Sequence, residues 1–357
     1  MSDSPMEPPS EPNDEEFSYA KFSIEYRESL LADVERGNLD ELRDSVYNRY
    51  YSTSSGFGSS GESFQELEPA IRDLWFAFHV WASNISHVAP EHDRVVLDFV
   101  RIQGSGPLRR LLKDSDHELE VARGPAGALW SDLPFFLEDT ITYFFKHFPT
   151  MKPDHRLNFT HFVAKVASTG LLQDRVTEVG LLTFREALET SRPLGSLQHP
   201  DDWENLQGLS DMSVAAFFPA IRAWVFEHGR KMINLCDVSW KECDASSGLG
   251  GPLFLASELS QKSPSGLSPG RWLFWIKRVD EIHQRATEAG ETKLADEAWA
   301  TLELMLNPLE DRDCPVSRAY HATPDDFIRT KWPEFWASRI LEDEDEGSET
   351  REAEAEN

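Results

Sequence analysis

Apolar residues recur at every third or fourth position along most of this 357-residue chain, which is the period of an amphipathic helix. Two of the clearest stripes lie between Leu67 and Ser83 and between Val95 and Ile102. The same spacing predicts further helices over residues 17–36, 39–51, 135–145, 157–169, 174–190, 213–236, 291–306 and 325–341. Helical segments therefore account for most of the sequence.

Segments with the two-residue period of a strand are nearly absent. The best candidate, residues 94–100, also fits a helix. About ten helices without alternating strands predict an all-α fold, either a multi-helix bundle or an irregular α-solenoid-like stack. Two Gly-rich stretches, 52–63 and 104–127, are predicted to be loops rather than domain boundaries, so we expect one domain over about residues 17–341.

The stretch Gly266-Leu-Ser-Pro-Gly270 fits the Gly-x-Ser-x-Gly pattern of a hydrolase nucleophile elbow. Such an elbow donates the backbone N–H of the residue after the serine to an oxyanion, and Pro269 has no N–H. The preceding residues 257–265 are polar and do not form an apolar strand. The segment instead predicts a helix start, with Ser268 as N-cap and Pro269 at the first helical position.

Gly56, Gly58 and Gly61 have the Gly-x-Gly-x-x-Gly spacing of a dinucleotide-binding loop. That motif requires a strand before it and a helix opening at its third glycine, whereas a helical pattern precedes these glycines and serines surround them. We therefore expect a flexible Ser/Gly loop over residues 52–63.

The formal charge of −28 is concentrated in part at the two ends of the chain. Residues 1–16 hold six acids and no Lys or Arg, and residues 342–357 hold nine acids against Arg351, so both ends are predicted to be disordered tails. The acidic balance and the lack of a basic stripe argue against nucleic-acid and anionic-membrane partners. No apolar run is long enough to span a bilayer, and we expect an intracellular protein, cytoplasmic or nuclear.

Neither the cysteines nor the histidines have a spacing that indicates a metal site. The chain has three cysteines, Cys236, Cys243 and Cys314, which is a small and odd number and does not suit a disulfide framework. A histidine group at positions 79, 87 and 92 lacks the i, i+4 spacing of a ligand pair, so ordinary solvated or capped histidines are expected. No metal or other cofactor is predicted.

The weak candidates for a binding site are Arg271, Trp272 and Trp275. Beside the glycine turn at 248–251, Arg271 could hold an anion while the two indole rings stack on a ligand. A tryptophan stripe at helical spacing more often belongs to the core. No residue is a candidate for catalysis.

Several blocks of this sequence resemble a fungal family of uncharacterised proteins, domain-of-unknown-function family 3632. The resemblance covers about residues 65–305 and rests on Leu74-Trp75, Trp130-Ser-Asp-Leu-Pro134, Leu157-Asn-Phe159, Gly250-Gly-Pro-Leu-Phe254 and Gly266–Trp275. It implies a similar helical fold and a fungal source, with no activity, substrate or catalytic residue to carry over.

Two classes of function remain open. The missing catalytic constellation and the acidic tails favour a helical interaction or scaffold protein with an unknown protein partner. The alternative is a small-molecule-binding or enzymatic bundle, with a site assembled from distant helices near Arg271 and Trp272.

Overall fold

The computed structural model describes residues 14–112, 117–201, 203–310 and 312–324, with the backbone alone over 14–21. Its thirteen α-helices and four very short strands confirm the all-α prediction. The helices are α1 (Asp14–Glu35), α2 (Leu39–Ser55), α3 (Phe64–Ser83), α4 (Pro90–Gly104), α5 (Phe136–His147), α6 (Pro153–Ser168), α7 (Thr177–Leu188), α8 (Val214–Asp237), α9 (Ala245–Gly248), α10 (Pro252–Leu255), α11 (Pro269–Ala289), α12 (Thr292–Glu310) and α13 (Pro315–His321). The helix predicted over 325–341 and the C-terminal acidic tail lie outside the described residues, as does the N-terminal tail up to Asp14, where α1 begins.

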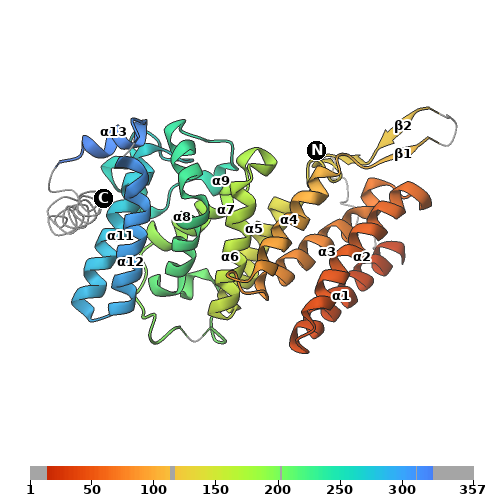
Figure 1. Ribbon diagram of the computed structural model, residues 1–357, viewed down its shortest axis with the longest axis horizontal. Helices are drawn as coiled ribbons and strands as arrows, with labels where there is room; N and C mark the ends of the chain where they lie inside the picture. The colour runs from red at the N-terminus through yellow and green to blue at the C-terminus, as the bar shows by residue number, and fades with distance from the viewer. Residues whose placement is uncertain (1–13, 113–116, 202, 311, 325–357) are drawn as a thin grey trace, which may run out of the picture.

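The helices form an elongated stack in chain order (Figure 1). Helices α1–α3 lie at one end and α11–α13 at the other, with α5, α7 and α9 in the middle. Helix α3 packs on α1, α2, α5 and α6, while α8 packs on α6, α7 and α12. None of the helices within the described ranges is both long and apolar enough to cross a membrane.

Helix α3 is the clearest example of how the sequence determines an element. Ser63 and Glu66 form a reciprocal capping box at its start, which satisfies two backbone donors of the first turn. Its apolar stripe is fully buried, and the ring of Trp75 packs against Phe99 and Phe136 at centroid distances of 5.7 and 5.6 Å. Aromatic side chains therefore join α3 to α4 and α5.

The prediction of a flexible loop over residues 52–63 is wrong. Helix α2 continues to Ser55, and residues Gly56–Ser60 form a π-helical turn. Phe57 is buried in that turn, and a Cβ on Gly56 would lie 2.8 Å from a carboxylate oxygen of Glu62. Burial of one aromatic ring therefore orders a segment whose composition predicts a linker.

The stretch 104–127 was predicted as a surface loop, but it contains two antiparallel hairpins. Strands β1 (Arg109–Leu111) and β2 (Leu119–Val121) pair with Leu111 opposite Leu119, and this hairpin projects from the α1–α3 end of the stack (Figure 1). Strands β3 (Arg123–Gly124) and β4 (Gly127–Ala128) follow directly.

Candidate functional site

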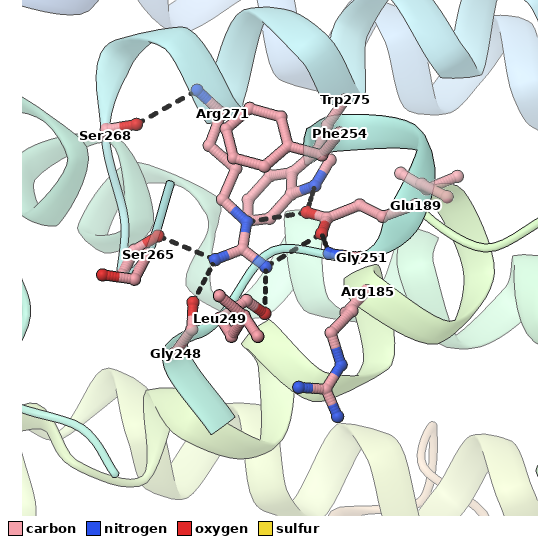
Figure 2. Close-up of polar contacts among 12 residues, drawn as sticks. Arg185, Glu189, Gly248, Leu249, Gly251, Phe254, Ser265, Ser268, Arg271 and Trp275 are labelled. Atoms are coloured by element: carbon pink, nitrogen blue, oxygen red, sulfur yellow. Dashed lines mark hydrogen bonds and ion pairs between the residues drawn. The ribbon is translucent and has the colours of Figure 1, made fainter. Parts of the chain in front are cut away.

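Arg271, Trp272 and Trp275 all lie inside the protein, on the first turns of α11. Figure 2 shows Arg271 and Trp275 with their polar contacts. The predicted helix start is confirmed, because the Ser268 side chain accepts a hydrogen bond from the Arg271 backbone N–H and Pro269 occupies the first helical position. The two indole rings meet edge to face, with centroids 6.0 Å apart. The tryptophan stripe therefore contributes to the core.

Arg271 forms a buried, two-pronged ion pair with Glu189, which follows the last residue of α7. Its Nε donates to Oε1 at 2.6 Å and its Nη2 to Oε2 at 2.9 Å. Its Nη1 donates to the carbonyl oxygens of Gly248 and Gly266, and its Nη2 also contacts that of Leu249 at 3.5 Å. These contacts occupy all five N–H groups of the guanidinium.

The carboxylate of Glu189 accepts four hydrogen bonds, two on each oxygen. Besides the two Arg271 bonds, Oε1 accepts from the indole N–H of Trp275 at 2.7 Å and Oε2 from the backbone N–H of Gly251 at 2.6 Å. A Cβ on Gly251 would lie 2.7 Å from the Cβ of Glu189, so this close approach requires glycine. The anion that Arg271 holds in this structure is therefore a side chain of the same protein.

This cluster fixes the segment that leads into and through α9. Arg271 binds the carbonyl of Gly248 (Figure 2). In addition, Arg185 donates to the carbonyl of Ser246 at 2.6 Å, and Glu178 accepts from the backbone N–H of Asp244 at 3.4 Å. The glycine turn at 248–251 therefore begins at the last residue of a short helix that these contacts hold in place.

Asp244, Ser246 and Ser247 form one wall of a groove of about 1,050 Å³, which we call the central groove. Its other walls come from the end of α4, the β3–β4 turn, one face of α5 and the turn before α7. The remaining lining residues are Gln103, Pro125, Ala126, Gly127, Ser131, Asp132, Leu133, Pro134, Phe135, Leu137, Glu138, Ile141, Thr142, Gly170, Leu171, Leu172, Gln173 and Arg175.

Strained backbone is concentrated in two turns at this groove. Seven non-glycine residues of the described chain have positive φ, and all but Ser239 lie in these turns. Large side chains rarely adopt this conformation, which costs on the order of 1–3 kcal/mol per residue and is typical of functional sites. The six residues with their φ values are Trp130 (71°), Leu133 (46°) and Phe135 (68°) in the first turn and Leu172 (54°), Gln173 (55°) and Asp174 (67°) in the second.

Packing on α3 holds the first turn in its strained form. The ring of Trp130 is buried edge-on against Trp75, with centroids 6.3 Å apart, and Trp75 donates its indole N–H to the carbonyl of Pro134 at 2.8 Å. The Arg72 guanidinium lies over the ring of Phe135, 4.2 Å from its centroid. The burial of Trp130 and the contact of Phe135 with Arg72 stabilise the turn against its unfavourable backbone.

Ion pairs hold the second turn. Lys231 reaches the carboxylate of Asp174 at 3.1 Å, and Arg175 pairs with Glu178. Glu178 is fully buried, and burial raises the pKa of its carboxyl above the usual range although Arg175 opposes the shift. Two ion pairs, one of which has a buried carboxylate, therefore fix the second turn.

The expectation of solvated or capped histidines is wrong for His79 and His92, which are both buried. His79 bonds to the hydroxyl of Thr140 at 2.9 Å, and His92 bonds to the carbonyl of Asn158 at 3.0 Å. Burial lowers the pKa of His79 to about 3 and that of His92 to about 4, so both are neutral at pH 7. His87 is half-buried and stacks on His161, with ring centroids 4.2 Å apart.

Cys236, Cys243 and Cys314 are free thiols. Burial raises the pKa of the Cys243 thiol, and its sulfur lies beside Gly248, where a Cβ would come within 2.7 Å of it. Within the described ranges, no three His, Cys, Asp or Glu side chains converge in a way that could hold a metal ion.

Comparisons with known proteins identify the family to which this chain belongs. A family model described as "Protein of unknown function (DUF3632)" matches residues 75–279, more than half of the chain. A Penicillium oxalicum (strain 114-2 / CGMCC 5302) protein named "Oxopyrrolidines biosynthesis cluster protein G" is 36% identical over 329 residues, which cover 91% of each chain. No solved structure matches. The resemblance found in the sequence is confirmed, and the chain belongs to the DUF3632 family, a family of unknown function.

Proposed function

We propose that this protein binds a small molecule in the central groove and serves the biosynthesis of a small metabolite. The name of the Penicillium relative, which ties that protein to an oxopyrrolidine biosynthesis cluster, supports the second half of the proposal. The groove supports the first half, since its volume is close to the upper end of the range for ligand pockets. The contacts around Arg271 give that cluster a supporting role, because they hold the α9 wall of the groove.

One observation carries the proposal: both strained turns lie at the same groove. Strain of this kind persists only where surrounding contacts impose it, and two such turns at one place indicate that the groove's shape matters. A fold needs no bulky residues at positive φ merely to connect helices, because glycine does this without strain.

The composition of the groove favours binding over catalysis. Its described lining residues include the carboxylates of Asp132, Glu138 and Asp244 and the hydroxyls of three serines, but no histidine, cysteine, lysine or tyrosine. The lining residues therefore include no histidine or lysine that could activate a serine nucleophile. Neutral polar groups such as Gln103, Thr142 and Ser247 alternate there with apolar ones such as Leu133 and Ile141. This mixture suits a neutral amphipathic molecule.

A cytoplasmic or nuclear location is part of the proposal and is supported by the three free thiols.

Replacing Thr142 with tryptophan should block the groove. Thr142 is exposed on α5, so the substitution should change the free energy of unfolding by less than about 0.5 kcal/mol. We expect native mass spectrometry of wild-type protein from a fungal host to show a small molecule that is lost on denaturation. The variant should carry it at least about tenfold less often, which corresponds to about 1.4 kcal/mol.

The matched control is Thr287→Trp, at an exposed position of α11 away from the groove. It should retain the ligand at the wild-type level. A bare chain mass for the wild type, or equal occupancy in both variants, would contradict the proposed function.

The second candidate is a protein-interaction function, favoured by the β1–β2 hairpin. Its paired residues Leu111 and Leu119 are 60% and 53% exposed, and a two-stranded ribbon leaves both edges open. Such an edge can accept an extended strand of a partner protein.

Leu119→Lys tests this candidate, because a charge on an edge strand opposes strand addition. Affinity purification from lysate should recover a partner with the wild type and with the control Leu97→Lys, an equally accessible leucine on α4. The Leu119 variant should lose that partner. Identical partner sets for all three proteins would exclude the hairpin as the contact.

A further inference from the structure

Among the described residues that line the central groove, Arg175 is the one with a positively charged side chain. Its side chain is 44% exposed, whereas its partner Glu178 is fully buried. The other charged lining residues are the acids Asp132, Glu138 and Asp244. Arg175 therefore differs in charge from every other charged group on these walls.

The ion pair with Glu178 fixes the guanidinium along one edge. Nε and Nη2 both donate to Oε1 of Glu178, at 3.2 and 3.1 Å. The guanidinium has five N–H groups, and three of them take no part in this pair. Because the buried carboxylate restrains one edge and the residue lines the groove, the rest of the donor fork is presented in a constant orientation.

The surrounding charges decide which acceptor suits this fork. Glu178 already balances the charge of Arg175, and the three acids of the walls disfavour a multiply charged anion such as a phosphate. A protonated amine has no acceptor atom for the remaining N–H donors of Arg175. A neutral carbonyl oxygen accepts N–H donors without adding charge.

The apolar lining residues define a second property that the ligand must have. Leu133, Ile141 and Leu172 offer hydrocarbon surface on the same groove, so the carbonyl compound needs an apolar portion. We infer that Arg175 recognises the carbonyl oxygen of a neutral, amphipathic amide or lactam bound in the central groove. This inference rests on the proposed function, whose ligand it defines.

Three probes that share an octyl chain separate the possible chemistries. N-octyl-2-pyrrolidone has a neutral lactam carbonyl, N-octylpyrrolidine is a cation without a carbonyl, and octanoate is an anion. Isothermal titration calorimetry on the full chain at pH 7, below the micelle concentration of each probe, gives the three Kd values. We expect the pyrrolidone to bind at least about tenfold more tightly than either charged probe.

The variant that tests the residue is the double substitution Arg175→Met with Glu178→Gln. It removes both charges together and so avoids leaving a buried carboxylate without its partner. It should bind the pyrrolidone about tenfold or more weakly while still binding the hydrocarbon chain. Arg175→Lys keeps one cationic donor and should recover part of the lost affinity. Thermal unfolding of each variant verifies that it is folded.

Different failures have different meanings. Unchanged pyrrolidone binding in the double variant, or equal Kd values for the three probes, would overturn the role of Arg175 and leave the groove as a binding site. If Thr142→Trp binds every probe as the wild type does, the groove is not the site, and the proposed function fails with the inference.

Discussion

Replacing Arg271 with methionine should lower the free energy of unfolding by about 3–5 kcal/mol, because it leaves a buried carboxylate without its counterion. Glu189 would lose both guanidinium bonds, and the carbonyls of Gly248 and Gly266 would lose their donor. Each buried group left without a partner costs about 1–3 kcal/mol. Urea unfolding of the wild type and the variant at pH 7 measures the difference.

Two further variants show that the effect comes from the buried ion pair. Arg278→Met removes a cation from the same helix whose partner Glu281 is partly exposed, and it should cost about 1 kcal/mol or less. Adding Glu189→Gln to Arg271→Met removes the buried charge and should restore part of the loss. A cost for Arg271→Met no larger than that for Arg278→Met would disprove this account.

Lowering the pH from 7 to 5 should destabilise the protein by about 4 kcal/mol through four buried groups. Burial lowers the pKa of His79 and His228 to about 3 and that of His92 to about 4, against 6.5 for an ordinary histidine. Below pH 6.5 the unfolded chain takes up protons at these three positions while the folded chain does not. Stability therefore falls as the pH falls, by about 2 kcal/mol per histidine at pH 5.

Asp139 opposes this trend. Burial raises the pKa of its carboxyl to about 6 from 3.8, although Arg72 lowers it. Between pH 6 and 3.8 the folded chain binds this proton and the unfolded chain does not, so acid stabilises the fold by about 1.4 kcal/mol at pH 5. The three histidines outweigh this single carboxyl, which leaves the net loss given above.

His79→Gln isolates one of these contributions, because glutamine can still donate to Thr140 and does not titrate. The variant should lose about 2 kcal/mol less than the wild type between pH 7 and 5. His199→Gln, at an exposed position, should lose as much as the wild type. Urea unfolding at both pH values provides the comparison, and an unaltered pH dependence in His79→Gln would show that this histidine is not the source.

The local sequence predicts elements well where one signal dominates. Ser268 and Pro269 specify the start of α11, and the stripe from Leu67 specifies α3. The short strands at 109–121 were missed because three residues per strand are too few to show a two-residue period. The helical turn at Gly56 depends on where Phe57 finds room in the core, which is a property of the whole fold.

The central groove could not be predicted because its turns contradict local preference. Leucine, tryptophan and phenylalanine favour negative φ, so their presence in a sequence does not predict a left-handed turn. The conformation of Trp130 depends on Trp75, which is 55 positions away, and packing against it selects the unfavourable backbone. The groove therefore becomes visible only when α3, α5 and α7 are in place.

Sequence reasoning found Arg271 but not Glu189. An arginine beside two tryptophans draws attention, whereas a glutamate at the end of an amphipathic helix looks like an ordinary surface residue. Glu189 could have been sought on chemical grounds, because a buried arginine requires an acidic partner somewhere in the chain.

The Glu189–Arg271 pair also bears on how long a folded molecule lasts. It joins residues 82 positions apart, and its charges lose water only when the surrounding core has closed around them. We expect such a contact to form after the folding barrier, so that it hardly accelerates folding and mainly slows unfolding. The expected consequence is a slower unfolding rate and a longer lifetime of the native state.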